Sequence, residues 1–159
     1  MPATLSAHRP NPLGFLPVWQ RNFLVWRKMA IPAILGNLAD PLIYMLGLGY
    51  GLGAMLPSID GRPYVAFLAA GTVCASTMNA ATFEALYSAF SRMHVQKTWE
   101  AILNTPLGLA DVVAGELFWA ATKSLFSGAA ILVVITGMGL THGPLVLWAL
   151  PAIVLTGLA

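Results

Sequence analysis

The sequence predicts an all-α protein that crosses a membrane several times. Of its 159 residues, 58% are hydrophobic and 9% are charged, and the mean hydropathy is +0.76. Soluble domains carry about 25% charged residues, so too few polar side chains are present to coat a water-facing surface. Pro63–Phe83 and Ser124–Ala159 contain no charged residue, and each reaches the roughly 20 residues that a helix needs to cross a bilayer. By its length the chain is a single domain.

The first 29 residues are expected to lie outside the spans. Residues 1–17 carry four prolines and predict an irregular tail. Residues 18–29 predict an amphipathic helix that lies in the headgroup layer. On a helical wheel one face carries Trp19, Phe23, Trp26 and Met29, and mostly opposite lie Gln20, Arg21, Leu24, Arg27 and Lys28. A positively charged flank of the first span is the alternative, and both interpretations place this segment on the same side of the membrane.

Four spans are predicted in a transmembrane domain of residues 30–159, at about 31–55, 63–83, 112–140 and 145–159. Small residues are frequent in the second span, which favours tight helix packing in lipid. Glu84 is expected to mark the exit of that span. The fourth span begins at Leu145, and no polar segment follows it before the sequence stops at Ala159. We therefore expect a chain that is cut off.

Two features of the first span leave alternatives open. Asp40 followed by Pro41 is a favourable N-cap and N1 pair, which predicts a helix that restarts there, and this is the preferred interpretation. Alternatively Asp40 lines a cavity and is a candidate residue of a translocation path. The alternating glycines predict either close helix contact through two GxxxG spacings or a frayed helix end; they are Gly47, Gly49, Gly51 and Gly53.

Residues 91–108 form a charged segment between the second and third spans, and the distribution of cations predicts its side of the membrane. Lys and Arg gather in the N-terminal segment and in this segment, whereas the loop at 56–62 carries only Arg62 and the turn at 141–144 carries none. The positive-inside rule therefore places the N-terminus and residues 91–108 in the cytoplasm.

Within this segment the sequence predicts a short helix. Thr98 is a favourable N-cap, the helix continues to Leu103, and Pro106 forces the preceding residue out of helical conformation. Its apolar side carries Trp99, Ile102 and Leu103, and Glu100 remains available for a cation of a partner. A helix this short needs a partner to pack on, so either it docks a partner or it is an amphipathic loop resting on lipid. Asp111 then supplies half of a capping box with Gly108 for the third helix, whose first turns carry Glu116 as well.

Motifs for several kinds of chemistry are absent from the sequence. It contains no G-x-x-x-x-G-K-[ST], H-E-x-x-H, C-x-x-C or G-x-S-x-G, which argues against ATP binding by a P-loop and against the corresponding hydrolases. His8, His94 and His142 lie far apart in the sequence and are predicted on both sides of the membrane, so no shared metal site is expected. We expect neither catalytic residues nor a cofactor.

The run from Lys97 to Leu107, KTWEAILNTPL, resembles the cytoplasmic loop of ABC-2 type exporter permeases. The flanking runs Phe83–Phe90 and Gly115–Lys123 are similar to one branch of that family, the nodulation permease (J protein) branch of lipo-oligosaccharide and polysaccharide exporters. The resemblance extends from about Trp19 onward. It implies six spans, of which the fifth and sixth are missing here, and a coupling helix at Thr98–Leu103.

The resemblance further implies a bacterial inner-membrane subunit that moves an amphipathic glycolipid or lipo-oligosaccharide outward. ATP would be bound by a separate cytoplasmic ATPase, and a second permease copy would complete a homodimer in the bilayer; no nucleic acid is involved. The residues implied to couple to the ATPase are Lys97, Thr98, Trp99, Glu100, Ile102, Leu103 and Pro106. An intramembrane enzyme or a non-transporting scaffold subunit of lipid-linked sugar metabolism is the alternative.

Overall fold

The computed structural model of the chain describes residues 13–56, 58–59, 61–140 and 148–158. Within these residues the chain is helical apart from one two-stranded hairpin, which confirms the predicted all-α class. The elements in chain order are α1 (Phe15–Arg27), α2 (Ala30–Gly51), β1 (Ser58–Ile59), β2 (Arg62–Pro63), α3 (Tyr64–Phe83), the π-helical turns η1 (Glu84–Ser88) and η2 (Ser91–Val95), α4 (Thr98–Leu103), α5 (Leu109–Gly137) and α6 (Ala149–Leu158).

Among the described residues, three stretches of helix are long and apolar enough to cross a membrane: Ala30–Ala54, Tyr64–Val95 and Leu109–Gly137. The last has 29 residues, which at 1.5 Å per residue is about 44 Å and exceeds the hydrocarbon core of a bilayer. The protein is therefore an all-α polytopic membrane protein. The helix of the predicted fourth span, α6, has 10 described residues, and the predicted start at Leu145 lies outside the described residues.

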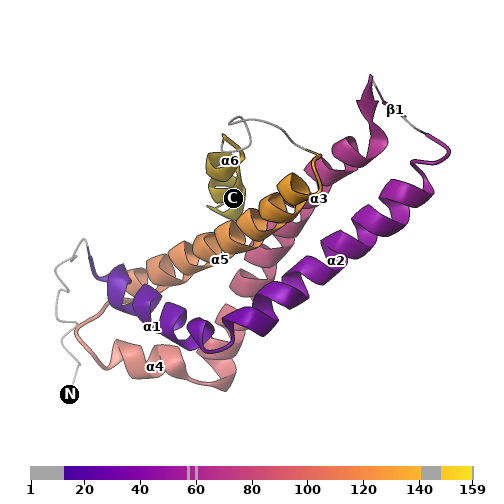
Figure 1. Cartoon of the computed structure of the whole chain (residues 1–159). Helices are drawn as coiled ribbons and strands as arrows, with labels where there is room; N and C mark the ends of the chain where they lie inside the picture. The colour runs from indigo at the N-terminus through magenta and orange to yellow at the C-terminus, as the bar shows by residue number, and fades with distance from the viewer. Residues whose placement is uncertain (1–12, 57, 60, 141–147, 159) are drawn as a thin grey trace, which may run out of the picture.

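The helices pack around a pair formed by α3 and α5 (Figure 1). One face of this pair carries α6, and α2 runs beside α3 before it diverges toward the hairpin. The apolar core between these helices consists of Met45, Ala69, Val73, Ile131, Ile135 and Ile153. Figure 1 places α1 and α4 at one end of the bundle and the hairpin at the other.

Close contacts at α5 depend on glycines. A Cβ atom added at Gly115 would lie 2.6 Å from Cβ of Val18 on α1, and one added at Gly128 would lie 2.7 Å from Cδ1 of Ile153 on α6. Both distances are far below van der Waals contact. Absence of a side chain at these two positions therefore allows α1 and α6 to approach the backbone of α5.

The first long helix passes without a break through Asp40 and Pro41, so the predicted restart at Asp40 is wrong. Proline is tolerated inside transmembrane helices because neighbouring groups and local adjustments satisfy the freed carbonyl. Of the alternating glycines, Gly49 is buried against Val65 and Leu68 of α3, whereas Gly47 and Gly51 have open space around them. The α-helix ends at Gly51, so close contact and a helix end both occur in this stretch.

The second long helix does not end at Phe83. It continues through η1 and η2 to Val95, so residues 91–95 of the charged segment are helical. π-Helical turns inside a longer helix are uncommon and are frequent at functional sites. This extension carries Glu84 and Arg92 to the end of the bundle where α1 and α4 lie.

Candidate functional site

The short helix predicted in the charged segment is present as α4, and it begins one residue earlier than predicted. Lys97 precedes it with φ 51° and ψ 28°, the one non-glycine residue with positive φ in the described part of the chain. This left-handed conformation is unfavourable for L-residues, and it turns the chain from η2 into α4. Thr98 is therefore the first helical residue rather than the N-cap, and its Oγ1 accepts a hydrogen bond from Nη2 of Arg21 at 3.4 Å.

The two sides of α4 differ in exposure. Trp99 and Ile102 are half-buried against the bundle, and Nε1 of Trp99 donates to Oε1 of Glu116 on α5 at 3.4 Å. The side chain of Glu100 is 67% exposed, with Nζ of Lys97 3.9 Å from its carboxylate. Leu103, predicted on the apolar side, is 41% exposed. This leaves an outward face of α4 on which a negative charge and an apolar side chain are both accessible.

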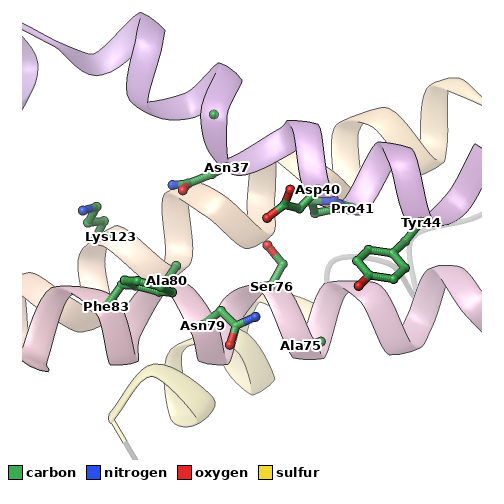
Figure 2. Close-up of a pocket in the computed structure, with 11 residues that line it drawn as sticks. Asn37, Asp40, Pro41, Tyr44, Ala75, Ser76, Asn79, Ala80, Phe83 and Lys123 are labelled. Carbon is green, nitrogen blue, oxygen red and sulfur yellow. The ribbon is translucent and has the colours of Figure 1, made fainter. Parts of the chain in front are cut away.

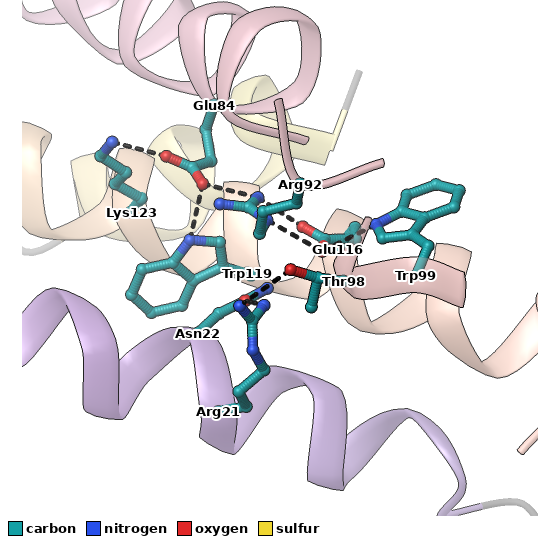
Figure 3. Close-up of polar contacts among 9 residues, drawn as sticks. All are labelled: Arg21, Asn22, Glu84, Arg92, Thr98, Trp99, Glu116, Trp119 and Lys123. Atoms are coloured by element: carbon teal, nitrogen blue, oxygen red, sulfur yellow. Dashed lines mark hydrogen bonds and ion pairs between the residues drawn. The ribbon is translucent and has the colours of Figure 1, made fainter. Parts of the chain in front are cut away.

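Behind α4 lies a group of charged and polar side chains that we call the buried polar cluster (Figure 3). It consists of Glu84, Arg92, Glu116, Trp119 and Lys123. Arg92 donates to Glu116 from Nε at 3.0 Å and from Nη2 at 2.5 Å, and the same Nη2 lies 2.8 Å from Oε1 of Glu84. The other oxygen of Glu84 accepts from Nζ of Lys123 at 2.5 Å, and Nε1 of Trp119 donates to Oε1 of Glu84 at 2.8 Å.

The buried polar cluster is balanced in charge, because its two carboxylates face one guanidinium and one ammonium group. Glu84 is 3% exposed and Glu116 is 7% exposed. Burial of a charge is costly unless it is paired and hydrogen-bonded, and both conditions are met here. The cluster fastens the extension of α3 to α5 and, through Trp99, to α4.

Sequence reasoning missed this cluster. The sequence predicts Glu84 at a span exit and Glu116 near a helix N-terminus, and it assigns no role to Lys123. The available signal was that Glu84, Glu116 and Lys123 sit within or beside apolar runs, where charged residues pair with one another. The capping expectation is confirmed: the backbone N–H of Gly108 donates to Oδ2 of Asp111 at 2.9 Å.

The aromatic side of α1 packs on α5. The ring of Phe15 stacks on Phe118 with centroids 4.7 Å apart, and Trp26 stacks on Phe126 at 4.9 Å. Nε1 of Trp19 donates to Oγ1 of Thr122 at 3.0 Å. This packing accounts for the aromatic face of the wheel, and the position of α1 relative to a headgroup layer stays a prediction.

Asp40 lines a polar cavity of about 310 Å³ between α2 and α3 (Figure 2). Its carboxylate is exposed rather than capped into a helix start. The other polar groups around it are the side chains of Asn37, Tyr44, Ser76, Asn79 and Lys123. The structure thus brings Asp40 to a cavity and not to α4, and its place on a translocation path stays a prediction.

Metal chemistry finds no support among the described residues. No group of three His, Cys, Asp or Glu side chains in this part of the chain lies close enough to hold an ion. His94 is exposed, and its ring packs on Phe90 with centroids 4.5 Å apart. His8 and His142 lie outside the described residues, so the expectation about a site shared by all three histidines is not tested.

The chain is similar to several curated proteins named nodulation protein J. It is 54% identical over 155 residues to the protein of Rhizobium meliloti (strain 1021), and 54% identical over 157 residues to that of Rhizobium leguminosarum bv. viciae. These alignments cover 98% and 99% of this chain, and 59% and 60% of the relatives. The protein of Azorhizobium caulinodans is 38% identical over 150 residues, which is 94% of this chain and 59% of that relative.

The chain spans between 56% and 60% of the length of the curated relatives that it matches. No family model matches the chain, and no solved structure matches it.

Proposed function

We propose that the chain belongs to the family of nodulation protein J, the ABC-2 type permease branch, and from this premise that it is a permease subunit of an ATP-binding cassette exporter. The observation that carries the proposal is the 54% identity across nearly the whole chain. Three helices of membrane-crossing length and composition agree with such a role. In this proposal the chain is a transport subunit and not an enzyme, and it has no nucleotide site of its own.

The proposed cargo is an amphipathic glycolipid or lipo-oligosaccharide that moves outward. The family resemblance motivates this choice. Support from the geometry comes from the polar cavity around Asp40, because hydroxyl, amide and carboxylate side chains at membrane depth are suited to hydrogen-bond a saccharide. Asp40 is the proposed residue of the translocation path.

Energy is proposed to enter through α4 from a separate cytoplasmic ATPase that binds the ATP. The exposed Glu100 and Leu103 form the face offered to the ATPase, flanked by Lys97 and by the exposed Pro106. The inward side of α4, with Trp99 and Ile102, rests on the bundle. A helix of this size can transmit force only when its inner side is fixed to larger elements, and α4 meets that condition.

Three links lead from α4 into the bundle. Trp99 contacts Glu116 of α5, Thr98 contacts Arg21 of α1, and the backbone joins α4 through η2 to the extension of α3. A displacement of α4 is therefore proposed to move α3 and α5 together with α1, and to reach α2 through its packing on α3.

The remaining assignments follow from the same proposal. The chain is placed in the bacterial inner membrane with a cytoplasmic N-terminus, because cations gather in the N-terminal segment and around α4. A second permease copy is proposed to pair with it.

The experiment that tests this function is co-expression with the neighbouring ATPase and purification through the permease. Wild type and Glu100→Arg are compared for co-purified ATPase and for ATP hydrolysis. Charge reversal on the exposed face of α4 is expected to abolish stable co-purification. The carboxylate of Glu100 is proposed to face a cation of the ATPase, and an arginine at this position would repel that cation. Lys28→Glu, a charge reversal of equal size at the exposed C-cap residue of α1, is the matched control and is expected to leave the complex intact.

Co-purification and hydrolysis that are indifferent to Glu100→Arg would overturn coupling through α4. An ATPase that co-purifies but whose hydrolysis does not respond to the permease would favour the scaffold alternative. Activity on a lipid-linked sugar in the absence of any ATPase would favour the enzyme alternative.

A further inference from the structure

A second cavity, of about 160 Å³, lies beside the buried polar cluster, between α1 and the extension of α3. Its walls are formed by α1, the extension of α3 up to Gln96, and α5; the charged and amide side chains on them are Arg21, Asn22, Glu84, Arg92 and Gln96. Figure 3 shows Arg21 and Asn22 on α1 facing Arg92 and Trp119. Two guanidinium groups, two amide groups and one carboxylate therefore line a space whose lining residues differ from those of the cavity around Asp40.

Asn22 is the most informative residue of this cavity. Its side chain is 3% exposed, and its Nδ2 has no hydrogen-bond partner among the described residues. The orientation of the amide is fixed, because Nη1 of Arg21 donates to Oδ1 of Asn22 at 3.0 Å and only the oxygen can accept. The unpartnered atom is therefore a donor. Buried donors without a partner are rare in folded proteins, so Asn22 lines this cavity with a donor that a bound acceptor would satisfy.

The charges around the cavity do not cancel. Arg92 is paired with both Glu84 and Glu116, whereas Arg21 hydrogen-bonds, within the described part of the chain, to the neutral side chains of Asn22 and Thr98. The pKa of Arg21 is lowered from its ordinary value, first by burial and then by the charge of Arg92, against the opposing effect of Glu116. Among the described residues the guanidinium of Arg21 makes no ion pair, whereas the two nearby carboxylates, Glu84 and Glu116, are both paired with Arg92.

The geometry points to a binding site for a phosphate group in this cavity, held by the guanidinium of Arg21 and the free amide donor of Asn22. Guanidinium groups match the tetrahedral oxygens of phosphate with paired donors, and the amide adds a further donor. The apolar wall at Val25 and Trp26, beside the exposed Leu24, suits the glycerol and acyl parts of an anionic phospholipid. Free phosphate offers the same acceptors, and the site does not depend on the proposed transport activity.

Binding is measured on the whole chain, purified in a neutral detergent and freed of lipid. Phosphatidylglycerol, phosphatidylcholine and inorganic phosphate are titrated in separate samples, and bound ligand is counted by native mass spectrometry. Asn22→Asp keeps the acceptor for Arg21 and replaces the amide donor by a negative charge, so the fold is retained while the site becomes repulsive. Arg21→Gln removes the uncompensated cation, and Arg27→Gln, which removes an exposed cation two turns along the same helix, is the matched control.

Wild type is expected to bind phosphatidylglycerol roughly tenfold more tightly than phosphatidylcholine, with that preference lost in Asn22→Asp and Arg21→Gln and kept in Arg27→Gln. This result supports a lipid phosphate. Binding of inorganic phosphate with the same dependence on Arg21 and Asn22, and no preference between the lipids, supports free phosphate. If a monodisperse Asn22→Asp variant binds every probe as wild type does, the proposal is overturned and the cavity holds water only.

Discussion

Arg92 holds Glu116 by two parallel hydrogen bonds, with Nε 3.0 Å from Oε1 and Nη2 2.5 Å from Oε2. Such two-point contacts between guanidinium and carboxylate groups are strong and fix geometry. The same Oε1 of Glu116 accepts from Trp99 on α4. One carboxylate on α5 therefore positions both Arg92 of η2 and the side chain of Trp99 on the inner face of α4.

Removal of the Arg92 guanidinium is expected to be the most damaging single change in the cluster. Arg92→Ala leaves Glu84 and Glu116 buried with fewer partners, and breaking a buried pair from one side costs about 3–5 kcal/mol. The measurement is the free energy of unfolding in mixed micelles by denaturant titration. Glu100→Gln, which disrupts the exposed pair with Lys97, is the control, and its cost is expected to stay below about 1 kcal/mol. An equal decrease in the free energy of unfolding in Arg92→Ala and Glu100→Gln would contradict the burial of the Arg92 ion pairs.

Glu84 and Lys123 are expected to behave as a coupled pair. Lys123→Met removes the ammonium group 2.5 Å from Glu84 and leaves the carboxylate with only Arg92 and Trp119. Adding Glu84→Gln removes the charge that was left behind, so the double variant should be more stable than the sum of the single changes predicts. A coupling energy of about 1–3 kcal/mol is expected from the double-mutant cycle. If the effects of the two single changes simply add, the side chains of Glu84 and Lys123 do not interact.

Gly115 is expected to control the contact between α1 and α5. In Gly115→Ala the new Cβ would meet Val18 at 2.6 Å and the carbonyl oxygen of Phe15 at 2.9 Å, so α1 must shift. Overpacking of this kind costs typically about 1–3 kcal/mol. Gly71→Ala on α3 is the control, since no atom lies within 4 Å, and it should be neutral or stabilising by up to about 1 kcal/mol. The measurement is protease cleavage after Arg27, the last residue of α1. It should become faster in Gly115→Ala and stay unchanged in Gly71→Ala.

Local signals were enough to predict α4. Its start near Thr98, its end before Pro106 and the cap contact of Asp111 all depend on residues within a few positions of one another. The same kind of local reasoning failed at Asp40, where a favourable N-cap pair predicted a restart and the helix instead continues to Gly51. A helix in lipid has no water to satisfy broken backbone hydrogen bonds. Keeping the helix unbroken is therefore more favourable than starting a new helix at the Asp40 cap.

The buried polar cluster could not be predicted from local pattern. The two ion pairs that join α5 to the extension of α3 connect residues 24 and 39 positions apart, and they form because the helix continues past Phe83 through two π-helical turns. Hydropathy placed a span end at Glu84, since a carboxylate is costly in lipid when it is alone. That cost disappears when Lys123, Arg92 and Trp119 surround the carboxylate, and only the packing of α3 on α5 provides them.

The two ends of the bundle are expected to lie on opposite sides of the membrane. The positive-inside rule places α4 in the cytoplasm and the hairpin outside, and Figure 1 shows the two at opposite ends of the bundle. In a Cys74→Ser background, single cysteines are introduced at the exposed positions Gln96 and Ser58. A membrane-impermeant maleimide added to intact spheroplasts should label Ser58→Cys at once and Gln96→Cys only after lysis. Because a cytoplasmic ATPase can reach α4 only from inside, labelling of Gln96→Cys from outside would remove the basis of the proposed coupling, whereas labelling of neither position before lysis would indicate that the hairpin is buried in the bilayer.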